Sequence, residues 1–426
     1  MSRYKRYEGY KDSGVEWIGE IPEHWGIIKL KFLSTIFKGK NPQELTDEWR
    51  EEFLPYLSME YLRNSGDTLT LYAYPEKNLV TVNNSDILIL WDGSNAGEIV
   101  EGKNGILSST MAKIVPNNIV TRYLYWFLKG IEKFFKDNTV GMGIPHVNGE
   151  TLKNHLVLLP NLQDQNSIAN FLDQKTAEID GLIADKEKLI ELLQEKRQAI
   201  ITEAVTKGLN PNVRMKDSGI EWIGEIPEHW NLRRIRYLAN IRNVKASDSD
   251  IDKTYVGLEN IESKTGKLLT NGDDEQQFVG ETANIFKKGD VLFGKLRPYL
   301  AKCIIADFDG RCTSELLVLK TTSYILPKYL HFFMLSPKFI DVVNSSTYGA
   351  KMPRASWDFI GNLEIPLPSI KEQEDIVEYL TEFISRIDDL ISDINTQIQK
   401  LKEYRQSLIS EAVTGKIDVR DYVVSN

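Results

Sequence analysis

The 426-residue chain has only two cysteines, Cys303 and Cys312, and five histidines scattered along its length. Two cysteines cannot build a disulfide scaffold or a four-cysteine zinc site, and no HExxH or Cys/His cluster supplies metal ligands at a suitable spacing. No hydrophobic run is long enough to cross a membrane, and no apolar core follows the basic N-terminal residues. We therefore expect a reduced, cytoplasmic protein with no secretory signal, no membrane span and no metal site.

Motifs typical of nucleotide-dependent and methyl-transferring enzymes are also missing. The chain has no GxxxxGK[ST] phosphate-binding loop and no GxGxxG after a predicted strand. The tripeptides NPQ at Asn41 and NPN at Asn210 lack the Pro-aromatic continuation of amino-methyltransferases. The acid–lysine mixture at 185–188 falls on a charged helix face, where such groups are usually solvated. We predict that the chain is not an enzyme by itself and holds no cofactor.

The charge of the chain is unevenly distributed. The net charge is −9, which by itself argues against a nucleic-acid partner because phosphates are neutralised by Lys and Arg. However, residues 161–207 carry 6 basic and 9 acidic residues and residues 369–426 carry 7 and 12, whereas residues 231–368 carry 19 and 16. One segment is therefore basic, and the charge of the whole chain does not decide the partner.

Half of the chain is repeated. KDSGVEWIGEIPEHW at 11–25 recurs as KDSGIEWIGEIPEHW at 216–230, and the stretch from Leu159 recurs from Leu367 at an offset of 208. The repeats divide the chain into seven segments: a repeat segment at 1–25 that packs with the C-terminal helix, a variable domain at 26–160, a long helix at 161–207, the second repeat segment at 208–230, a second variable domain at 231–368, a second long helix at 369–415, and a tail at 416–426.

The two long helices carry heptad patterns. Apolar residues on alternating three- and four-residue steps are typical of a coiled coil. The positions predicted to face the partner helix are Ile168, Leu172, Ile179, Leu182, Leu189, Leu193 and Ile200 in the first helix, and Ile376, Leu380, Phe383, Ile387, Leu390, Ile394, Leu401, Tyr404 and Leu408 in the second. We expect the helices to pair antiparallel, to stop near Gly208 and Gly415, and to bring the two chain termini close together.

The variable domains read as one mixed fold with two different surfaces. Predicted strands at 86–90 and 112–116 precede an amphipathic helix at 121–138, and the second domain has strands at 290–294 and 315–320 before a helix at 327–346. We predict an α+β (mixed α/β) protein. Its two similar globular domains are joined by two long helices in an antiparallel coiled coil, with pseudo-two-fold symmetry.

The order of these segments resembles that of the specificity subunits of type I restriction–modification systems. The resemblance rests on the repeated KDSGxEWIGEIPEHW leader, the LPxxxxQ entry into each long helix, and the helix end SLISEAVTGKID at 407–418. It implies that each variable domain is a target-recognition domain for one half of a bipartite double-stranded DNA site. It also implies that the helices set the spacing and hold two methyltransferase (modification) subunits, which motor–nuclease (restriction) subunits then join. S-adenosylmethionine, and ATP with Mg, would bind to those partners.

Two loops in each variable domain are candidates for DNA contact. The first follows a predicted strand, at 90–99 and 293–302, and the second is a glycine-containing stretch at 138–150 and 345–358. Lys and Arg reach phosphates or guanine edges, and Ser and Asn can bond to base edges. The candidates are Ser94, Asn95, Met142, His146 and Asn148 in the first domain, and Lys295, Arg297, Tyr299, Tyr348, Lys351 and Arg354 in the second.

Several candidates have a structural alternative. Ser94 and Asn95 fit an ordinary polar hairpin equally well, and Asn148 is a good helix N-cap residue. The repeated tryptophans Trp17, Trp25, Trp222 and Trp230 are predicted to bind the partner subunits, because two copies of one partner require two copies of one surface. They can equally form the cores of the repeat segments.

Two other kinds of function stay open. One is a structural coiled-coil adaptor with two protein-binding heads, and the other is an enzyme hidden in the variable domains, which the missing motifs disfavour. DNA binding in the presence of a methyltransferase partner would distinguish a specificity subunit from an adaptor.

Overall fold

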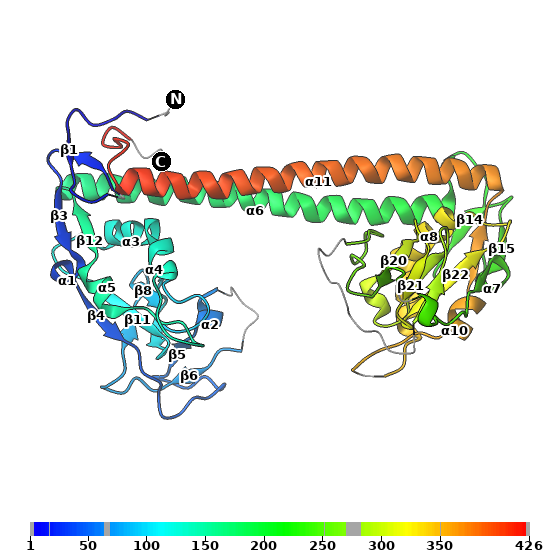
Figure 1. The fold of residues 1–426 in the computed structure, drawn as a ribbon, viewed down its shortest axis with the longest axis horizontal. Helices are drawn as coiled ribbons and strands as arrows, with labels where there is room; N and C mark the ends of the chain where they lie inside the picture. Colours follow the sequence, from blue (N-terminus) through cyan, green and yellow to red (C-terminus); the bar gives the residue numbers. More distant parts are fainter. Residues whose placement is uncertain are drawn as a thin grey trace. The chain divides into compact units, whose positions relative to one another are not determined.

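The computed structural model describes residues 4–16, 18–63, 69–250, 252–269, 283–349 and 351–422. The chain divides into two compact units. Unit 1 comprises Met1–Lys186 and Thr396–Asn426, and unit 2 comprises Glu187–Asn395 (Figure 1). Each unit therefore contains one variable domain and parts of both long helices.

The globular part of unit 1 is built on two small four-stranded sheets. The first is antiparallel and has the order β4 (Ser34–Lys38), β11 (Met111–Pro116), β8 (Ile87–Leu90), β9 (Ile99–Glu101). The second has the order β6 (Tyr72–Ala73), β5 (Leu54–Leu57), β10 (Gly105–Leu107), β7 (Thr81–Val82). All four residues of β8 are buried, and α3 (Thr121–Gly130) contributes Tyr123, Leu124 and Phe127 to the core.

Shorter elements complete unit 1. They are α1 (Leu30–Leu33), α2 (Met59–Arg63), α4 (Glu132–Asp137), α5 (Gly149–Asn154) and the antiparallel pair β3 (Gly26–Lys29) and β12 (Leu156–Leu159). Strand β12 leads directly into the first long helix, so the ladder between β3 and β12 ties the start of the variable domain to the start of that helix.

Unit 2 repeats this arrangement. Its main sheet has the order β16 (Ala239–Ile241), β22 (Leu316–Thr321), β19 (Val291–Gly294), β20 (Cys303–Ile305), and its second has β17 (Tyr255–Val256), β21 (Gly310–Cys312), β18 (Asn284–Phe286). The other elements are β15 (Asn231–Arg234), β23 (Glu364–Leu367), α7 (Ile235–Leu238), α8 (Pro327–Leu335), α9 (Pro337–Ser345), α10 (Trp357–Asn362), η1 (Asp248–Asp250) and η2 (Pro298–Leu300). The prediction of one mixed fold present twice is confirmed.

The two amphipathic helices predicted between the strands and the second loop are each broken in two. In unit 2 the break falls at Ser336, because the following Pro337 disfavours a helical conformation for the residue before it and lacks an N–H. In unit 1 it falls between Gly130 and Glu132. A Cβ on Gly130 would lie 3.2 Å from Val413, so the glycine allows a close approach to the second long helix.

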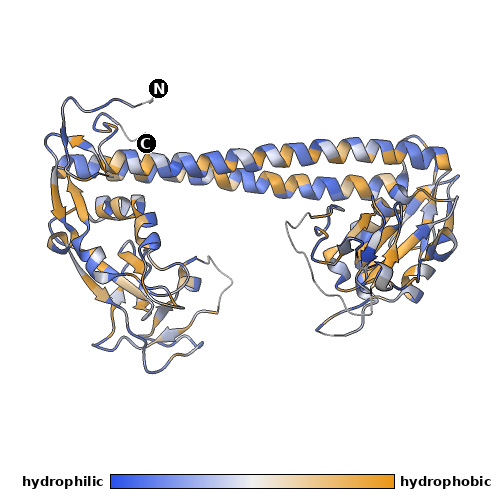
Figure 2. Ribbon diagram, viewed as in Figure 1, coloured by the Kyte–Doolittle hydropathy of each residue, from blue (hydrophilic) through white to orange (hydrophobic). Residues whose placement is uncertain are grey.

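The long helices are α6 (Leu162–Lys207) and α11 (Ile370–Val413), and they run antiparallel within each unit. In unit 1, Asp180 contacts Arg405 and Lys186 contacts Gln397, so the numbering rises on one helix as it falls on the other. In unit 2, Arg197 contacts Asp388, while residues 201–205 share a core with residues 376–380. Figure 2 shows hydrophobic and hydrophilic residues alternating along both helices.

The predicted heptads have the correct period, but four of the sixteen named positions are exposed. Thr176, Ile183 and Arg197 are buried, whereas the predicted Leu182 and Leu189 are exposed. On α11, Ile398 is buried, whereas the predicted Leu390 and Tyr404 are exposed. We call the positions facing the other helix the seam. The seam includes polar residues such as Arg197, and this obscured its phase.

The repeat segments form hairpins that receive the end of a long helix. The hairpins are β1 (Tyr10–Asp12) with β2 (Glu20–Pro22), and β13 (Met215–Asp217) with β14 (Glu225–Pro227). In unit 1, Tyr10 Oη donates to the carbonyl of Gly415, and Lys5 forms a β-bridge with Asp418. The prediction that the two ends of the chain lie close together is confirmed.

Candidate nucleic-acid interface

The two candidate loops of unit 1 lie against each other. The loop at 91–97 follows β8, and the loop at 140–146 is a short hairpin closed by reciprocal hydrogen bonds of 2.9 and 2.8 Å between Val140 and His146. Gly93 N donates to Pro145 O and Val147 N donates to Trp91 O, both at 2.9 Å. Residues about 50 positions apart in the sequence therefore share one surface, at the end of the fully buried strand β8.

The side chains on this surface are mixed in character. Ser94 and Asn95 are exposed, His146 is half-buried, and Met142 is fully exposed. Asp92 forms an ion pair with Lys38, with 3.1 Å between Oδ2 and Nζ. The surface of unit 1 therefore has neutral polar groups, the apolar Met142, and one cation, Lys38, whose charge is neutralised by Asp92.

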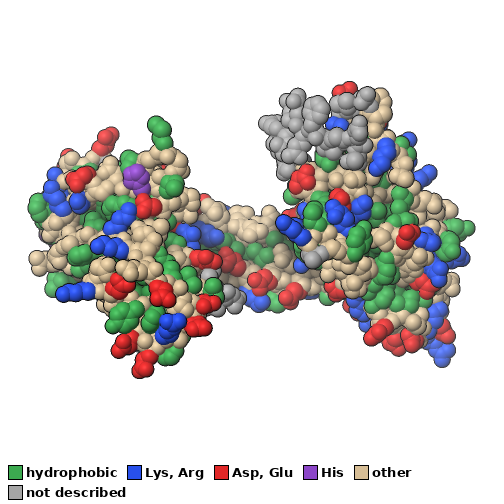
Figure 3. Space-filling model, turned by 90° about the horizontal axis from the view of Figure 1, so that it is seen from below, with side chains coloured by type: hydrophobic (Ala, Val, Ile, Leu, Met, Phe, Trp, Pro, Cys, Tyr) green, Lys and Arg blue, Asp and Glu red, His purple; other side chains and the backbone are tan. Residues whose placement is uncertain are grey.

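The two candidate loops of unit 2 meet in the same way. Ala355 N donates to Lys295 O at 2.9 Å, and Arg297 N donates to Pro353 O at 2.8 Å. Tyr348 and Arg354 exchange backbone hydrogen bonds of 3.1 and 3.0 Å, as Val140 and His146 do in unit 1. In the view of Figure 3, Lys and Arg side chains are interspersed with hydrophobic ones over the globular part of each unit.

Arg297 is held in an unusual backbone conformation. It is exposed and has a φ of 51°, a left-handed conformation that is uncommon for residues with a side chain. The loop of unit 1 places Gly93, with a φ of 114°, at the corresponding turn. The same turn thus has no side chain at Gly93 in unit 1 and a guanidinium group at Arg297 in unit 2.

Arg354 is engaged by an acidic partner. Its Nε and Nη2 both lie 3.1 Å from carboxylate oxygens of Glu315, so the pair is bidentate. Tyr348, Tyr299 and Lys351 are exposed, and Lys295 is half-buried. Arg354 therefore positions the second loop, whereas Arg297 and Lys351 present their side chains outward.

Asn148 and Ser356 are helix caps. Asn148 Oδ1 accepts hydrogen bonds from Glu150 N and Thr151 N at 3.1 and 3.2 Å, and Ser356 Oγ accepts from Phe359 N at 3.2 Å. The structural alternative for Asn148 therefore holds. Its side-chain oxygen satisfies the first turn of α5, and its role as a DNA contact stays a prediction.

Two of the repeated tryptophans are core residues. Trp25 and Trp230 are completely buried, and their indole N–H groups donate to Asp164 and Glu372 at 3.3 and 3.1 Å. The prediction that these two bind a partner is wrong, because neither has a surface to offer. Trp222 is half-buried with its ring 6.1 Å from that of Phe333, and Trp17 lies outside the described residues.

The acidic partners of these tryptophans were missed in the sequence. Asp164 and Glu372 correspond under the offset of 208, and each also pairs with the histidine before the tryptophan, His24 at 2.8 Å and His229 at 2.7 Å. Partial burial acts to raise the pKa of Glu372, but hydrogen bonds from His229, Trp230 and Ser369 outweigh it and lower the pKa to about 2. The sequence did contain a signal for these partners, because an acidic residue recurs at the offset of 208.

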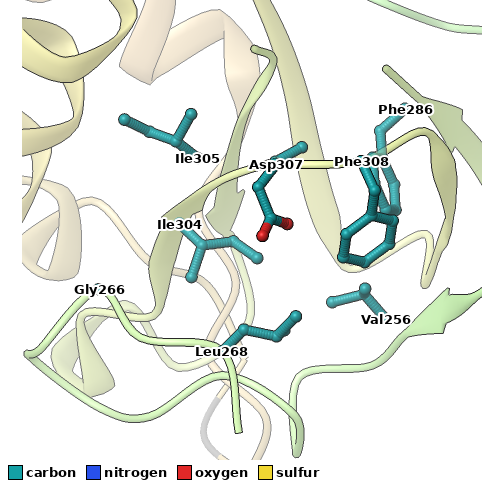
Figure 4. Close-up of a pocket in the computed structure, with 9 residues that line it drawn as sticks. Val256, Gly266, Leu268, Phe286, Ile304, Ile305, Asp307 and Phe308 are labelled. Atoms are coloured by element: carbon teal, nitrogen blue, oxygen red, sulfur yellow. The ribbon is translucent and has the colours of Figure 1, made fainter. Parts of the chain in front are cut away.

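Unit 2 also contains a cavity of about 220 Å³. Its walls come from β17, β18, β20 and neighbouring loops, and the carboxylate of Asp307 points into it among apolar side chains such as Ile304 and Phe308 (Figure 4). None of the candidate DNA-contacting residues lines it. A single carboxylate among apolar groups has no partner for nucleophilic or acid–base catalysis in that lining.

The described part of the chain shows neither a metal-ligand cluster nor a membrane-spanning helix. Within those residues, no cluster of three or more His, Cys, Asp or Glu side chains could hold a metal ion. In the same residues, no helix is both long and apolar enough for a transmembrane span.

Comparisons with known proteins agree on one family. The type I restriction modification DNA specificity domain matches residues 22–192 and again residues 227–400. The type I restriction enzyme MjaVIII specificity subunit of Methanocaldococcus jannaschii is 31% identical and covers 94% of this chain and 95% of its own. The type I restriction enzyme EcoDI specificity subunit of Escherichia coli is 24% identical, and the match covers 94% of this chain and 90% of that subunit. A chain from a structural study of type I R-M system assembly superposes with a TM-score of 0.68 at 14% identity, over 92% of this chain and 98% of that one. The two chains therefore share the fold.

Proposed function

The chain belongs to the specificity subunits of type I restriction–modification systems, and from this premise we propose that it directs methylation and cleavage to a bipartite DNA sequence. Each unit reads one half of the site with the surface formed by its two loops. The observation that carries this proposal is the contrast between those surfaces, which share their backbone pairing but differ in side chains. Gly93 corresponds to Arg297, and His146 to Arg354.

The proposed DNA contacts differ in kind between the units. In unit 2, Arg297 is the principal reader, because it is exposed and its guanidinium can bond bidentately to guanine. Lys351 and Lys295 would contact phosphates, and Tyr299 and Tyr348 offer rings and hydroxyls. In unit 1, Ser94, Asn95 and His146 would bond to base edges.

The repeated surfaces are proposed to bind two copies of a methyltransferase subunit, which motor–nuclease subunits then join. The repeat supports this, because two identical docking surfaces suit two copies of one partner. Of the predicted aromatic contacts, Trp222 keeps part of its ring accessible. S-adenosylmethionine, and ATP with Mg, would bind to those partners, and this chain would contribute no catalytic group.

The experiment is co-expression with a methyltransferase subunit of the same system, followed by sequencing of the methylated positions in the host DNA. We expect two short specific half-sites separated by a fixed unread gap. Replacing residues 231–368 with the corresponding domain of a relative should change one half-site only. A single continuous site, or methylation that is unaffected by the exchange, would contradict the proposal. DNA binding that is absent even with the partner would favour the adaptor function.

A further inference from the structure

The hairpin at 140–146 in unit 1 carries large apolar side chains that contact little of the protein. Met142 is fully exposed, Ile144 is 70% exposed and Val140 is 41% exposed. The hairpin is nevertheless well anchored. Both backbone hydrogen bonds between Val140 and His146 are present, and Asp92 forms a second β-bridge to His146.

Glycines shape the tip that presents these side chains. Gly141 and Gly143 have φ values of 113° and 98°, which side-chain-bearing residues rarely adopt. A Cβ on Gly141 would lie 2.7 Å from the carbonyl oxygen of Ile144. Met142 thus stands between two glycines at the point of a turn, and its side chain is fully exposed.

The occupant of this apolar tip can be inferred from the difference between the two units. A surface for a partner bound in two copies would be the same in both, as the EWIGEIPEHW segments are. Among the described residues of the unit 2 hairpin, the exposed Tyr348 and Met352 stand at the positions of Val140 and Ile144, and Lys351 stands at the position of Gly143. Divergence at the tip, together with a cation in one of the two copies, fits double-stranded DNA rather than a second protein.

We propose that Met142 and Ile144 read DNA by apolar contact with thymine 5-methyl groups in the major groove. This inference rests on the proposed function. The major groove accepts a two-stranded β-ribbon, and the thymine methyl is the apolar feature that distinguishes its base pairs. Such a contact would be favourable for the exposed Met142, because it would remove the apolar surface of the side chain from water. The half-site of unit 1 therefore contains at least one A·T pair that is recognised without a hydrogen bond from these side chains.

The test uses the full chain bound to its methyltransferase subunits and a duplex containing the site found by methylation sequencing. Each thymine in both half-sites is replaced in turn by deoxyuridine, which lacks only the 5-methyl group. At one or two positions the wild-type complex should bind about four-fold more weakly, the effect expected from one buried methyl. Met142→Ala should bind the thymine duplex correspondingly weakly and should not respond to deoxyuridine at the position that Met142 contacts, whereas a position contacted by Ile144 should keep its response. Met142→Leu, which keeps the apolar surface, serves as the matched control and should keep the response.

Three results would overturn the inference. The first is a site at which no deoxyuridine affects wild-type binding. The second is a Met142→Ala complex that keeps the whole wild-type response to deoxyuridine, or that binds all DNA equally more weakly, as expected if the side chain were wedged between base pairs. The third is loss of the methyltransferase subunits from Met142→Ala, which would identify the tip as a protein contact. A bipartite site with no thymine-methyl effect rejects this inference alone, whereas no DNA binding by the wild-type complex rejects the proposed function as well.

Discussion

Arg405 forms a bidentate pair with Asp180, with Nε–Oδ1 and Nη2–Oδ2 distances of 2.9 and 3.1 Å. The equivalent residues at an offset of 208 make the same pair in the other unit, where Arg197 Nη1 lies 3.0 Å from Asp388 Oδ1. Both arginines occupy seam positions. A shift of one helix along the other would break both pairs, so the repeated pair fixes the antiparallel register of α6 and α11.

The two pairs differ in burial, and this predicts unequal energies. The side chain of Arg197 is only 6% exposed, and its Nη2 also donates to Thr265 O, whereas Asp180 is 52% exposed. Arg197→Ala should lower the free energy of unfolding by about 3 kcal/mol, because it leaves Asp388 partly buried with one cation fewer. Arg405→Ala should cost less than about 1 kcal/mol, as exposed pairs do. Urea denaturation of both variants measures this, and equal losses would contradict it.

Trp230 is expected to stabilise unit 2 in two separable ways. Trp230→Phe removes the indole bond to Glu372 while keeping much of the ring, and should cost about 1.5–3 kcal/mol, as for a hydrogen bond to a charged group. Trp230→Ala also leaves a cavity, and should cost about 3–5 kcal/mol or prevent folding. Calorimetry of the Phe variant is decisive. A Phe variant of wild-type stability that no longer binds the methyltransferase would restore Trp230 as a partner contact.

Arg297 should affect DNA specificity without a loss of stability. Arg297→Gly removes the side chain and also suits the left-handed backbone, so the fold should be at least as stable. If Arg297 reads guanine, binding to the cognate site should weaken by about 1–3 kcal/mol and one position of one half-site should be relaxed. Arg297→Lys should then fail to restore specificity, because an ammonium cannot bond bidentately. If Arg297 instead holds a phosphate, Lys should restore binding, and Gly should weaken it uniformly.

The stability of unit 2 should fall in mild acid. Burial lowers the pKa of His331 to about 4, and nearby Lys328 and Arg197 act in the same direction. The unfolded chain, with an ordinary histidine pKa of about 6.5, binds a proton between pH 6.5 and 4 that the folded state does not. The contribution of the neutral His331 to the free energy of unfolding is therefore complete above pH 6.5, and it is lost as the pH falls towards 4. Thermal unfolding of His331→Gln, which can still donate to the carbonyl of Cys303, should depend less on pH over this range. An unchanged dependence would exclude His331 as the cause.

The length of the helix pair should set the gap between the half-sites. Seven residues inserted after Lys186 in α6, and seven at the matching point after Thr396 in α11, preserve the heptad phase and add about 10 Å to each helix. Methylation sequencing should then show a gap changed by up to about three base pairs, with both half-sites unaltered. In the parent protein we expect the half-site centres to lie about one helical turn of DNA apart. Altered base preference with an unaltered gap would refute the role of the helices as a spacer.

The sequence predicted the two long helices and the repeated domain because the repeats mark them, and it predicted the buried strands β8, β11, β19 and β22 because they are short apolar runs. It misplaced part of the seam, since Leu182 and Leu390 lie beside the seam while Arg197 and Arg405 lie within it. Hydrophobicity alone cannot identify a seam arginine that is stabilised by an aspartate on the other helix.

The candidate site was predicted as separate loops and found as joined ones. Their junction depends on backbone hydrogen bonds such as Gly93 N to Pro145 O, and backbone groups leave no signature in side-chain types. The sequence also did not indicate which side chains are free to contact DNA. Arg297 and Arg354 look alike in the sequence, yet Glu315, 39 residues before Arg354, engages only the second. The cap at Asn148 was the easier part, because Asn is among the preferred helix N-cap residues.

The junction between Tyr10 and Gly415 also bears on the order of events during synthesis. Unit 2 is one uninterrupted stretch, Glu187–Asn395, whereas unit 1 needs Thr396 and the residues after it to complete its helix pair and to receive the β1–β2 hairpin. Chains emerge from the ribosome at about 5–20 residues per second and their domains fold as units. The domain that comes first in the sequence is therefore completed last, and a nascent chain carries an unfinished unit 1 for the roughly 10–40 s in which unit 2 is made.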